Sequence, residues 1–476
     1  MTKLGRIRKI SPAGVATSEP IQTTPNDRWS SASMFVLAGT GASIGFTNIW
    51  QLPGLAAQYG GGAFVLAYVA FVVLFGVPLL IAQVVIGRTA RASPVYALRL
   101  LAPRRRHAVA WSAVGGIAVA ACFIVFSYLS VIAGWMSAYV LRSAVGVFAG
   151  QTADGMASLF TALVRDPEKQ LFWHAGFIGV CALIVARGVR AGLEALVRIA
   201  VPLVFALFLV LVGYAVAVGS FGSALLHVLE PDFAKLSWTA LLIAAGQVFF
   251  SLGLGFGMMI MYGAYVREDV SIPRAALTIA GLDTLTAVLA AIVVFAVLFA
   301  GSVEPASGPG LVFQALPLAF DHLPYGRWFA TAFFLLLSLV ALVRAIPMFE
   351  TVTVWVGERF RLGRVRAVAA VAVAAWAVGL VTVLSFNYWA FSFSVFGIEK
   401  KLGVFDLLQV ATTQALLPLG ALLLALFAGW ALRTETTREA LALRSPCAYD
   451  AWIWLLRLAV PLVLLALLFN LHKLYP

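Results

Sequence analysis

The sequence predicts an all-α protein that crosses a membrane many times. Of its 476 residues, 62% are hydrophobic and only 11% are charged, and the mean hydropathy is +0.98. An average soluble domain is about 45–50% apolar and about 25% charged. Apolar segments of about 20 residues, the length needed to span a bilayer, recur between Ser33 and Leu471 with short polar gaps. This composition leaves no room for a sizeable soluble domain.

Eleven apolar spans follow one another along the chain. They are expected near residues 32–56, 63–87, 110–141, 172–186, 196–218, 238–264, 274–300, 328–357, 367–385, 405–431 and 450–471. The first 30 residues place Lys and Arg among Ser, Thr and Pro and contain no apolar segment. We therefore expect residues 1–30 to form a disordered cytosolic tail and not a cleaved signal peptide.

Basic residues set the expected orientation. Of the 33 Lys and Arg residues, 23 lie in the tail and in loops on the same side of the membrane, whereas 8 lie in the opposite loops. Cytosolic loops carry an excess of Lys and Arg, so the N-terminus is expected in the cytosol and the C-terminus outside. The net charge of +13 has the same origin, and no nucleic-acid partner is expected. The three cysteines lack CxxC spacing and predict neither disulfides nor a metal site.

Glycines interrupt two of the spans at corresponding places. The first span contains Gly39-Thr-Gly-Ala-Ser-Ile-Gly-Phe46 and the sixth contains Ser251-Leu-Gly-Leu-Gly-Phe-Gly257. Because five spans separate them, the second copy would be inverted in the membrane. Broken helices in two inverted halves indicate the central site of a transporter, and irregular backbone at this depth is tolerated where it lines a cavity. The alternative is that the glycines only let helices pack closely.

Three ionisable residues fall inside spans, where such groups are costly and are candidates for function. Asp283 has small and apolar neighbours and needs a cation, a proton or an arginine; alternatively, it is a protonated structural residue. Arg344 needs an anionic or carbonyl environment, unless it extends to a membrane surface. Glu350 follows six residues later, about 240° around a helix. Asp283 or unwound backbone carbonyls are therefore the expected partners of Arg344.

Several motifs resemble those of the neurotransmitter:sodium symporter family, in its eleven-span bacterial branch. They are Gly41-Ala-Ser-Ile-Gly-Phe-Thr-Asn48-Ile-Trp-Gln-Leu-Pro53, Tyr59-Gly-Gly-Gly-Ala-Phe64, Ala186-Arg-Gly-Val189, Gly246-Gln-Val-Phe-Phe-Ser-Leu-Gly-Leu-Gly-Phe-Gly257 with Tyr262 and Tyr265-Val-Arg267, and Glu304-Pro-Ala-Ser-Gly-Pro-Gly-Leu-Val-Phe313. The resemblance covers nearly the whole chain. It implies location in a bacterial inner membrane and a LeuT-like fold with broken first and sixth helices.

The resemblance also implies a division of the chain. Residues 31–432 would form the transporter core, built from inverted repeats over about residues 31–220 and 237–432. Residues 433–476 would then form a cytosolic loop and the eleventh helix.

Two sodium sites are implied by this resemblance. The first would use the Ser43 carbonyl and the side chains of Asn48, Ser251 and Asp283, and the charge of Asp283 makes a chloride requirement unexpected. The second would lie at Gly41, Ile44, Val340, Val343 and Arg344. Val343 and Arg344 replace two hydroxyl ligands of the family there, so we expect that site to be lost and one Na+ to be bound.

The implied substrate pocket lies at the helix breaks. Its expected lining is Ala42, Ser43, Phe46, Thr47, Val125, Leu129, Phe250, Gly253, Phe256 and Met348. Gly45 stands where an aspartate marks monoamine transporters, which favours a carboxylate-bearing substrate. Leu129 stands where the family has a tyrosine that binds the substrate carboxylate, and Tyr128 beside it would point about 100° away.

The expected gates also depart from the family pattern. The outer gate would pair Gln51 with Gln409, both neutral, so an amide–amide hydrogen bond could replace the family ion pair, and Phe250 would close over the substrate. At the inner gate Asn26 takes the place of an arginine, with Arg28 nearby and Glu358 as the acidic partner.

The expected function is therefore a sodium-coupled symporter of amino acids or similar small carboxylate-bearing solutes, working by alternating access. One alternative is a sodium-independent or proton-coupled carrier or exchanger in which Arg344 replaces the ion. Another is a sensor that does not transport. No nucleophile–base pair or metal cluster is found in the sequence, so enzymatic activity is not expected. The expected partners are a small molecule and the lipid bilayer, and the sequence does not predict the oligomeric state.

Overall fold

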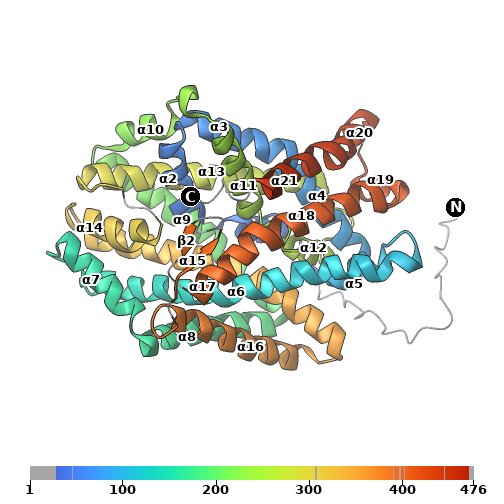
Figure 1. The fold of residues 1–476 in the computed structure, drawn as a ribbon, viewed down its shortest axis with the longest axis horizontal. Coiled ribbons are helices and arrows are strands. Elements are labelled where there is room, and N and C mark those ends of the chain that lie inside the picture. Colours follow the sequence, from blue (N-terminus) through green and yellow to red (C-terminus); the bar gives the residue numbers. More distant parts are fainter. Residues whose placement is uncertain are drawn as a thin grey trace.

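The computed structural model describes residues 28–45, 47–305, 308–389, 391–395, 398–400, 403–443 and 445–470. All but the last three residues of the expected tail, 1–30, lie outside this part. The described residues form a helical bundle whose long helices run along the longest direction of the molecule (Figure 1). The expected all-α membrane fold is thereby confirmed.

Within the described residues, nine continuous helical segments are long and apolar enough to cross a membrane. They are Gly62–Ala90 (α3, Gly62–Phe71; η2, Val72–Gly76; α4, Val77–Ala90), Arg105–Ala144 (η3, Arg105–His107; α6, Ala108–Ala144), Pro167–Ala186 (α8), Val189–Ala217 (η4, Val189–Glu194; α9, Ala195–Ala217), Ile272–Ala300 (α13), Gly326–Phe360 (α15), Arg364–Ser385 (α16), Val404–Ala431 (α17, Val404–Val410; η7, Ala411–Leu416; α18, Leu417–Leu426; η8, Phe427–Ala431) and Pro446–Phe469 (α20, Pro446–Trp454; η9, Leu455–Ala459; α21, Val460–Phe469). Two pairs of short helices complete the eleven spans.

The short pairs are the broken spans. In the first span α1 (Ala32–Ser43) stops and α2 (Thr47–Gln58) begins, and in the sixth α11 (Trp238–Ser251) stops and α12 (Met258–Ala264) begins. Gly253, Gly255 and Gly257 all adopt positive φ between α11 and α12, a conformation that only glycine adopts readily. In the first span, by contrast, α1 runs through Gly39 and Gly41 and ends before Gly45. Both interruptions are therefore real, although only the sixth span needs left-handed glycines.

Shorter elements connect the spans. They are α5 (Pro94–Leu100), α7 (Ala153–Val164), α10 (Phe221–Leu229), η5 (Phe233–Lys235), η6 (Leu311–Ala315), α14 (Leu316–Asp321), α19 (Thr434–Leu441) and an antiparallel pair of strands, β1 (Phe393–Val395) and β2 (Ile398–Lys400). Several helices begin at a side-chain cap, which satisfies an otherwise unpaired N–H. Ser31 caps α1, Asp166 caps α8 and Ser237 caps α11.

Wide π turns accompany four prolines, three of them inside spans and Pro317 in the short helix α14. The turns η2, η6, η7 and η9 end two residues before Pro78, Pro317, Pro418 and Pro461. Proline has no N–H, and its ring collides with the carbonyl four residues earlier in a regular helix. In each case that carbonyl belongs to a residue inside the π turn, so the wider turn accommodates the ring without ending the helix.

The packing places the two broken helices inside the bundle. The longest helix, α6, packs along α15, and α8 and α16 cover one side of it (Figure 1). Helix α1 contacts α9, α13 and α15, whereas α12 contacts α4 and α15. Both breaks are therefore surrounded by protein, as irregular backbone in a membrane requires.

Candidate functional site

Four buried oxygen-bearing side chains meet beside the two breaks. Asn48 at the start of α2 donates from Nδ2 to Ser251 Oγ at 2.8 Å and to Asp283 Oδ1 at 3.0 Å. Ser251 donates to Asp283 Oδ2 at 2.5 Å, and Tyr68 donates to the same oxygen at 3.4 Å. The structure thus brings together the three side chains expected at the first sodium site. Their amide, hydroxyl and carboxylate oxygens are hard donors that suit a hard cation.

Arg344, on α15, donates to the carbonyl ends of both broken helices. Its Nη1 donates to the carbonyls of Ala42, of Ser43 at 2.9 Å and of Ser251 at 2.9 Å, and Nη2 donates to the Phe250 carbonyl at 2.6 Å. Only 3% of Arg344 is exposed. The expected carbonyl environment is confirmed, and the alternative in which Arg344 extends to a membrane surface is wrong. The fourth residue of the expected sodium site, Ser43, shares its carbonyl with this guanidinium.

The residues of the second expected sodium site form an apolar contact. Ile44, Val340 and Val343 are buried, and a Cβ on Gly41 would lie 3.2 Å from the Cβ of Val343. The guanidinium of Arg344 extends beyond these residues to the carbonyls named above. Side chains at this place therefore offer no hydroxyl oxygen to an ion.

Half of the expected pocket residues lie at the Arg344 guanidinium: Ala42, Ser43, Phe250, Gly253 and Phe256. Val125, Leu129, Phe256 and Met348 are buried, whereas Phe250 is partly buried. The ring of Phe256 lies 5.8 Å from Cζ of Arg344, and Phe250 meets Phe256 edge to face at 6.3 Å. Phe46 lies outside the described residues, and so does the side chain of Thr47.

At the end of the bundle where the outer gate is expected, no hydrogen bond joins the side chains of Gln51 and Gln409 in the part of the chain that the structure describes. Both residues are partly exposed. The contact expected between these gate residues stays a prediction. Nearby, Tyr128 and Thr412 join α6 to η7 through their hydroxyl oxygens, 3.4 Å apart.

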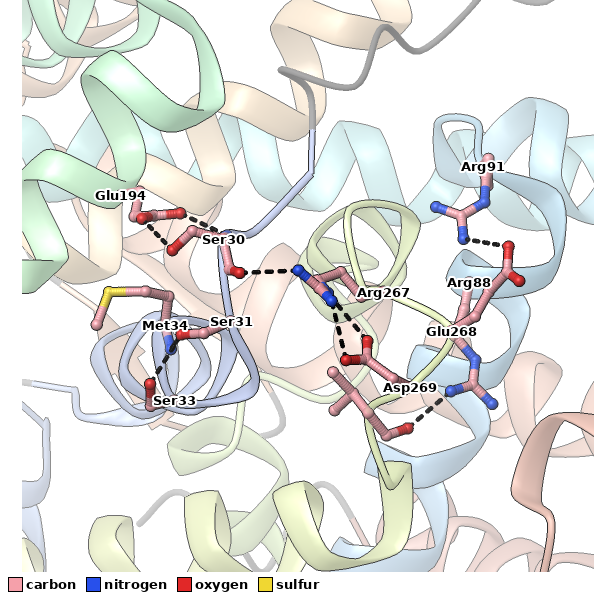
Figure 2. Close-up of polar contacts among 11 residues, drawn as sticks. Ser30, Ser31, Ser33, Met34, Arg88, Arg91, Glu194, Arg267, Glu268 and Asp269 are labelled. Carbon is pink, nitrogen blue, oxygen red and sulfur yellow. Dashed lines mark hydrogen bonds and ion pairs between the residues drawn. The ribbon is translucent and has the colours of Figure 1, made fainter.

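At the opposite end of the bundle, which carries the start of α1 and which we call the inner end, the chain is held by a polar network (Figure 2). Ser30 donates its hydroxyl and its N–H to the carboxylate of Glu194, at 2.5 and 2.8 Å. Arg267 donates to the Ser30 carbonyl at 3.1 Å and forms an ion pair with Asp269. The hydrogen bond that Arg267 donates to Asp269 lowers the pKa of the Asp269 carboxyl. The network ties α1 to η4 and to the loop after α12.

Trp29 completes this closure. It is fully buried, donates from its ring to the Tyr262 carbonyl at 3.2 Å, and packs edge to face on Tyr262 and Tyr265. A second buried link lies beside it, because Glu350 accepts from Tyr265 at 2.5 Å and from Arg364 at 2.7 Å. Glu350 is therefore not a partner of Arg344, as the sequence indicated.

The other expected inner-gate residues do not pair with each other. Glu358 accepts from the Ser93 N–H at 3.1 Å, and no ion pair joins it to Arg28 within the described residues. Arg28 lies instead near Arg91. Partial burial and the charge of Arg28 lower the pKa of Arg91, and the carboxylate of Glu268 offsets part of this shift. Asn26 lies outside the described residues.

Sequence reasoning did not find three residues that touch the site. Tyr68 reaches Asp283 from α3, Gln247 donates to Asn48 Oδ1 at 3.5 Å, and the Cys122 thiol donates to the Phe256 carbonyl at 2.9 Å. Tyr68 and Cys122 are isolated polar residues in apolar spans, and Gln247 lies in the motif Gly246–Gly257 without a role assigned to it. Only the packing of distant spans brings them to the site.

Comparisons with known proteins agree with this fold. The profile of the sodium:neurotransmitter symporter family matches residues 26–154 and 170–474. The sodium-dependent transporter YhdH of Bacillus subtilis is 32% identical over 451 residues, covering 93% of this chain and 97% of the relative. A sodium-dependent transporter of Haemophilus influenzae is 29% identical, covering 92% and 96%. The crystal structure of MhsT in complex with L-phenylalanine has a TM-score of 0.84 and 33% identity, covering 94% of this chain and 100% of MhsT.

Proposed function

This chain belongs to the sodium:neurotransmitter symporter family, and on that premise we propose that it couples one sodium ion to the transport of an amino acid or a similar small carboxylate-bearing solute. Its relatives from B. subtilis and H. influenzae are named as sodium-dependent transporters. MhsT was crystallised with L-phenylalanine, which supports a small-molecule substrate of this kind. We place the protein in a bacterial inner membrane, with the N-terminus in the cytosol and the C-terminus outside.

The observation that carries the proposal is the cluster of Asn48, Ser251 and Asp283. These groups come from three spans and lie within 2.5–3.0 Å of one another. Sodium binding requires oxygens only, so the Asn48 amide would turn its Oδ1 toward the ion and give up the hydrogen bonds that Nδ2 makes. The ion would then supply the positive charge that the Asp283 carboxylate lacks among its immediate partners. A carboxylate already present in the site is also consistent with transport that needs no chloride.

We expect a single sodium ion because the second sodium site lacks its ligands. Its hydroxyl ligands are replaced by Val343 and Arg344, and a fixed guanidinium nearby repels another cation. During transport, Phe250 would cover the solute from outside while Trp29 and the Ser30–Glu194 contact hold the inner end closed. Release of the inner end and closure of the outer end would then complete alternating access.

The hydrogen bonds of Arg344 favour a second candidate function. Since its guanidinium already joins both broken helices, the chain could carry solute as a sodium-independent or proton-coupled carrier or exchanger. In that case Asp283 would take up a proton where the symporter takes up sodium.

Thermal unfolding of the purified protein in sodium and in choline distinguishes these functions. A ligand that binds only the folded state stabilises it by RT ln(1 + [L]/Kd), about 2.7 kcal/mol at a hundredfold excess over Kd. We expect sodium to raise the melting temperature of the wild type. If sodium stabilises only Arg344→Ser, the arginine has replaced the ion and the second candidate function is favoured.

Uptake into proteoliposomes tests coupling directly. A symporter accumulates labelled solute when sodium is outside and stops when choline replaces it. Accumulation that is equal in the two media would contradict sodium coupling.

A further inference from the structure

The helix breaks of this protein already hold a cation of their own. The Arg344 guanidinium donates to two carbonyls at the end of α1, those of Ala42 and Ser43, and to two at the end of α11, those of Phe250 and Ser251. It lies among buried groups and carries a permanent charge. Two carbonyls at the C-terminal end of each half-helix are therefore engaged.

These carbonyls are the natural partners of a positive group. The C-terminal end of a helix carries the negative end of its dipole, and in broken-helix transporters such ends bind cations. The ammonium group of a solute has three N–H donors and no acceptor, so it would need several of these carbonyls at once. Binding it would displace a guanidinium that cannot become neutral, and the displaced charge would be left buried and unpaired, which is strongly unfavourable.

Charge balance leads to the same conclusion, and this step rests on the proposed single sodium ion. Asp283 and Arg344 contribute opposite charges, so one bound sodium leaves the site with an excess of one positive charge. A solute with one carboxylate and no ammonium group neutralises that excess. A zwitterionic amino acid, whose own charges cancel, would leave it uncompensated in a buried site.

The guanidinium also keeps donors for an anion. The hydrogen bonds of Nη1 and Nη2 leave Nε–H and one N–H of Nη2 without an acceptor in the described part of the chain. These two nitrogens share one edge of the planar fork, and such an edge pairs with both oxygens of a carboxylate. Gly253 leaves room for Met258 and for the fork, because a Cβ there would lie 1.8 Å from Cε of Met258 and 3.3 and 3.4 Å from Nη1 and Nη2. Leu129 at the pocket adds no competing polar group.

We infer that the solute carried by this protein is a small carboxylate anion without an ammonium group, and that Arg344 excludes amino acids by occupying the place of their ammonium. Arg344 is then a specificity-determining residue as well as a fixed charge.

Matched pairs of ligands test this inference on the wild-type protein. Each pair differs by the ammonium group alone: L-alanine and propionate, L-leucine and 4-methylpentanoate, L-phenylalanine and 3-phenylpropionate. Thermal stability is measured with each compound in saturating sodium, and counterflow of the labelled compounds is measured in proteoliposomes. We expect at least one acid to bind at least tenfold more tightly than its amino twin. Equal or tighter binding of the amino acids, or no binding in any pair, would overturn the inference.

Arg344→Ser, with Arg344→Lys as the variant that keeps the charge, tests the assigned cause. Releasing the four carbonyls in Arg344→Ser should shift preference toward the amino acid of the pair, whereas Arg344→Lys should keep preference for the acid. An unchanged preference in Arg344→Ser would contradict the role of the guanidinium. The same experiments distinguish failure of the proposed function from failure of this inference. If acids are exchanged without sodium, sodium coupling is wrong and the inferred solute class still holds.

Discussion

At the scale of single residues, Asp283 and Arg344 carry opposite charges in the same buried site but use different partners. The carboxylate accepts from Asn48, Ser251 and Tyr68, and the guanidinium donates to backbone carbonyls. Removing either charge would leave the other without compensation, a change that is costly in a buried site. The two residues therefore form one electrostatic unit, although no ion pair joins them within the described residues.

The contribution of Asp283 to ion binding can be measured with Asp283→Asn. The amide keeps the size of the side chain but removes the negative charge that a bound sodium would neutralise. We expect sodium to stabilise the wild type and to lose most of this effect in the variant, measured as the sodium-dependent shift in melting temperature. Thr284→Val is the matched control, because the Thr284 hydroxyl on the same helix has no hydrogen-bond partner among the described residues. A similar sodium shift in Asp283→Asn and Thr284→Val would contradict the first sodium site.

At the scale of the elements, the break in the sixth span depends on backbone that only glycine allows. Gly255 has a φ of 95°, and a Cβ there would lie 2.5 Å from the carbonyl oxygen of Leu417 in α18. Both the strain and the collision involve backbone, so neither is relieved by turning a side chain. The break is thus held between its own conformation and a neighbouring span.

Gly255→Ala tests this dependence. A non-glycine residue in such a conformation costs about 1–3 kcal/mol, and the shift of α18 adds to that cost. We expect a lower melting temperature and loss of solute binding at the break. Gly281→Ala in α13 is the control, since no atom of the described residues lies within 4 Å of its Cβ position and alanine favours a helix by about 1 kcal/mol relative to glycine. Equal stability of the two variants would show that the break tolerates a side chain.

The sequence predicted the existence of these elements better than their contacts. Apolar length alone predicted the spans, and repeated glycines predicted the two breaks. Gly39 and Gly41 have a different role in the structure: Cβ atoms at these positions would lie within 2.3 Å of Ile279 and 3.0 Å of Val201, so they allow close packing inside α1. The sequence predicted carbonyl partners for Arg344 but not that its guanidinium joins both breaks, because that depends on the separation of α15 from each of them. Tyr68 was missed for the same reason.

At the scale of the whole molecule, the inner end is closed by contacts that join distant parts of the chain. Ser30 reaches Glu194 in η4, Trp29 packs on α12 and on Tyr265, and Glu350 in α15 links Tyr265 to α16 through Arg364 (Figure 2 shows the first of these). The side chain of Glu194 is only 2% exposed, although its partner Arg198 is largely exposed. Loss of the charge of this buried carboxylate should therefore weaken the contact that holds the start of α1.

Glu194→Gln should loosen the inner end. A hydrogen bond to a charged group contributes about 1.5–3 kcal/mol, and each 1.4 kcal/mol lost corresponds to a tenfold change in an equilibrium constant. Cys122 offers a native reporter, because it is fully buried one turn before Val125 in α6 and donates to the Phe256 carbonyl. With Cys181 and Cys447 replaced by serine, maleimide labelling of Cys122 measures how often the buried region beside the Phe256 carbonyl opens to the reagent. We expect labelling to be about tenfold faster in Glu194→Gln.

Glu268→Gln provides the comparison for this change. Glu268 lies in the same network, but its side chain is 83% exposed and it is 3.7 Å from Arg91, and such surface ion pairs contribute about 0–1 kcal/mol. The labelling rate of Glu268→Gln should therefore stay near that of the protein in which only Cys181 and Cys447 are replaced. Sodium and solute favour a closed site, so they should slow the labelling of Cys122 in both Glu194→Gln and Glu268→Gln. Equal labelling of the two variants would mean that the start of α1 is held by Trp29 and its aromatic partners, with Glu194 contributing little to closure.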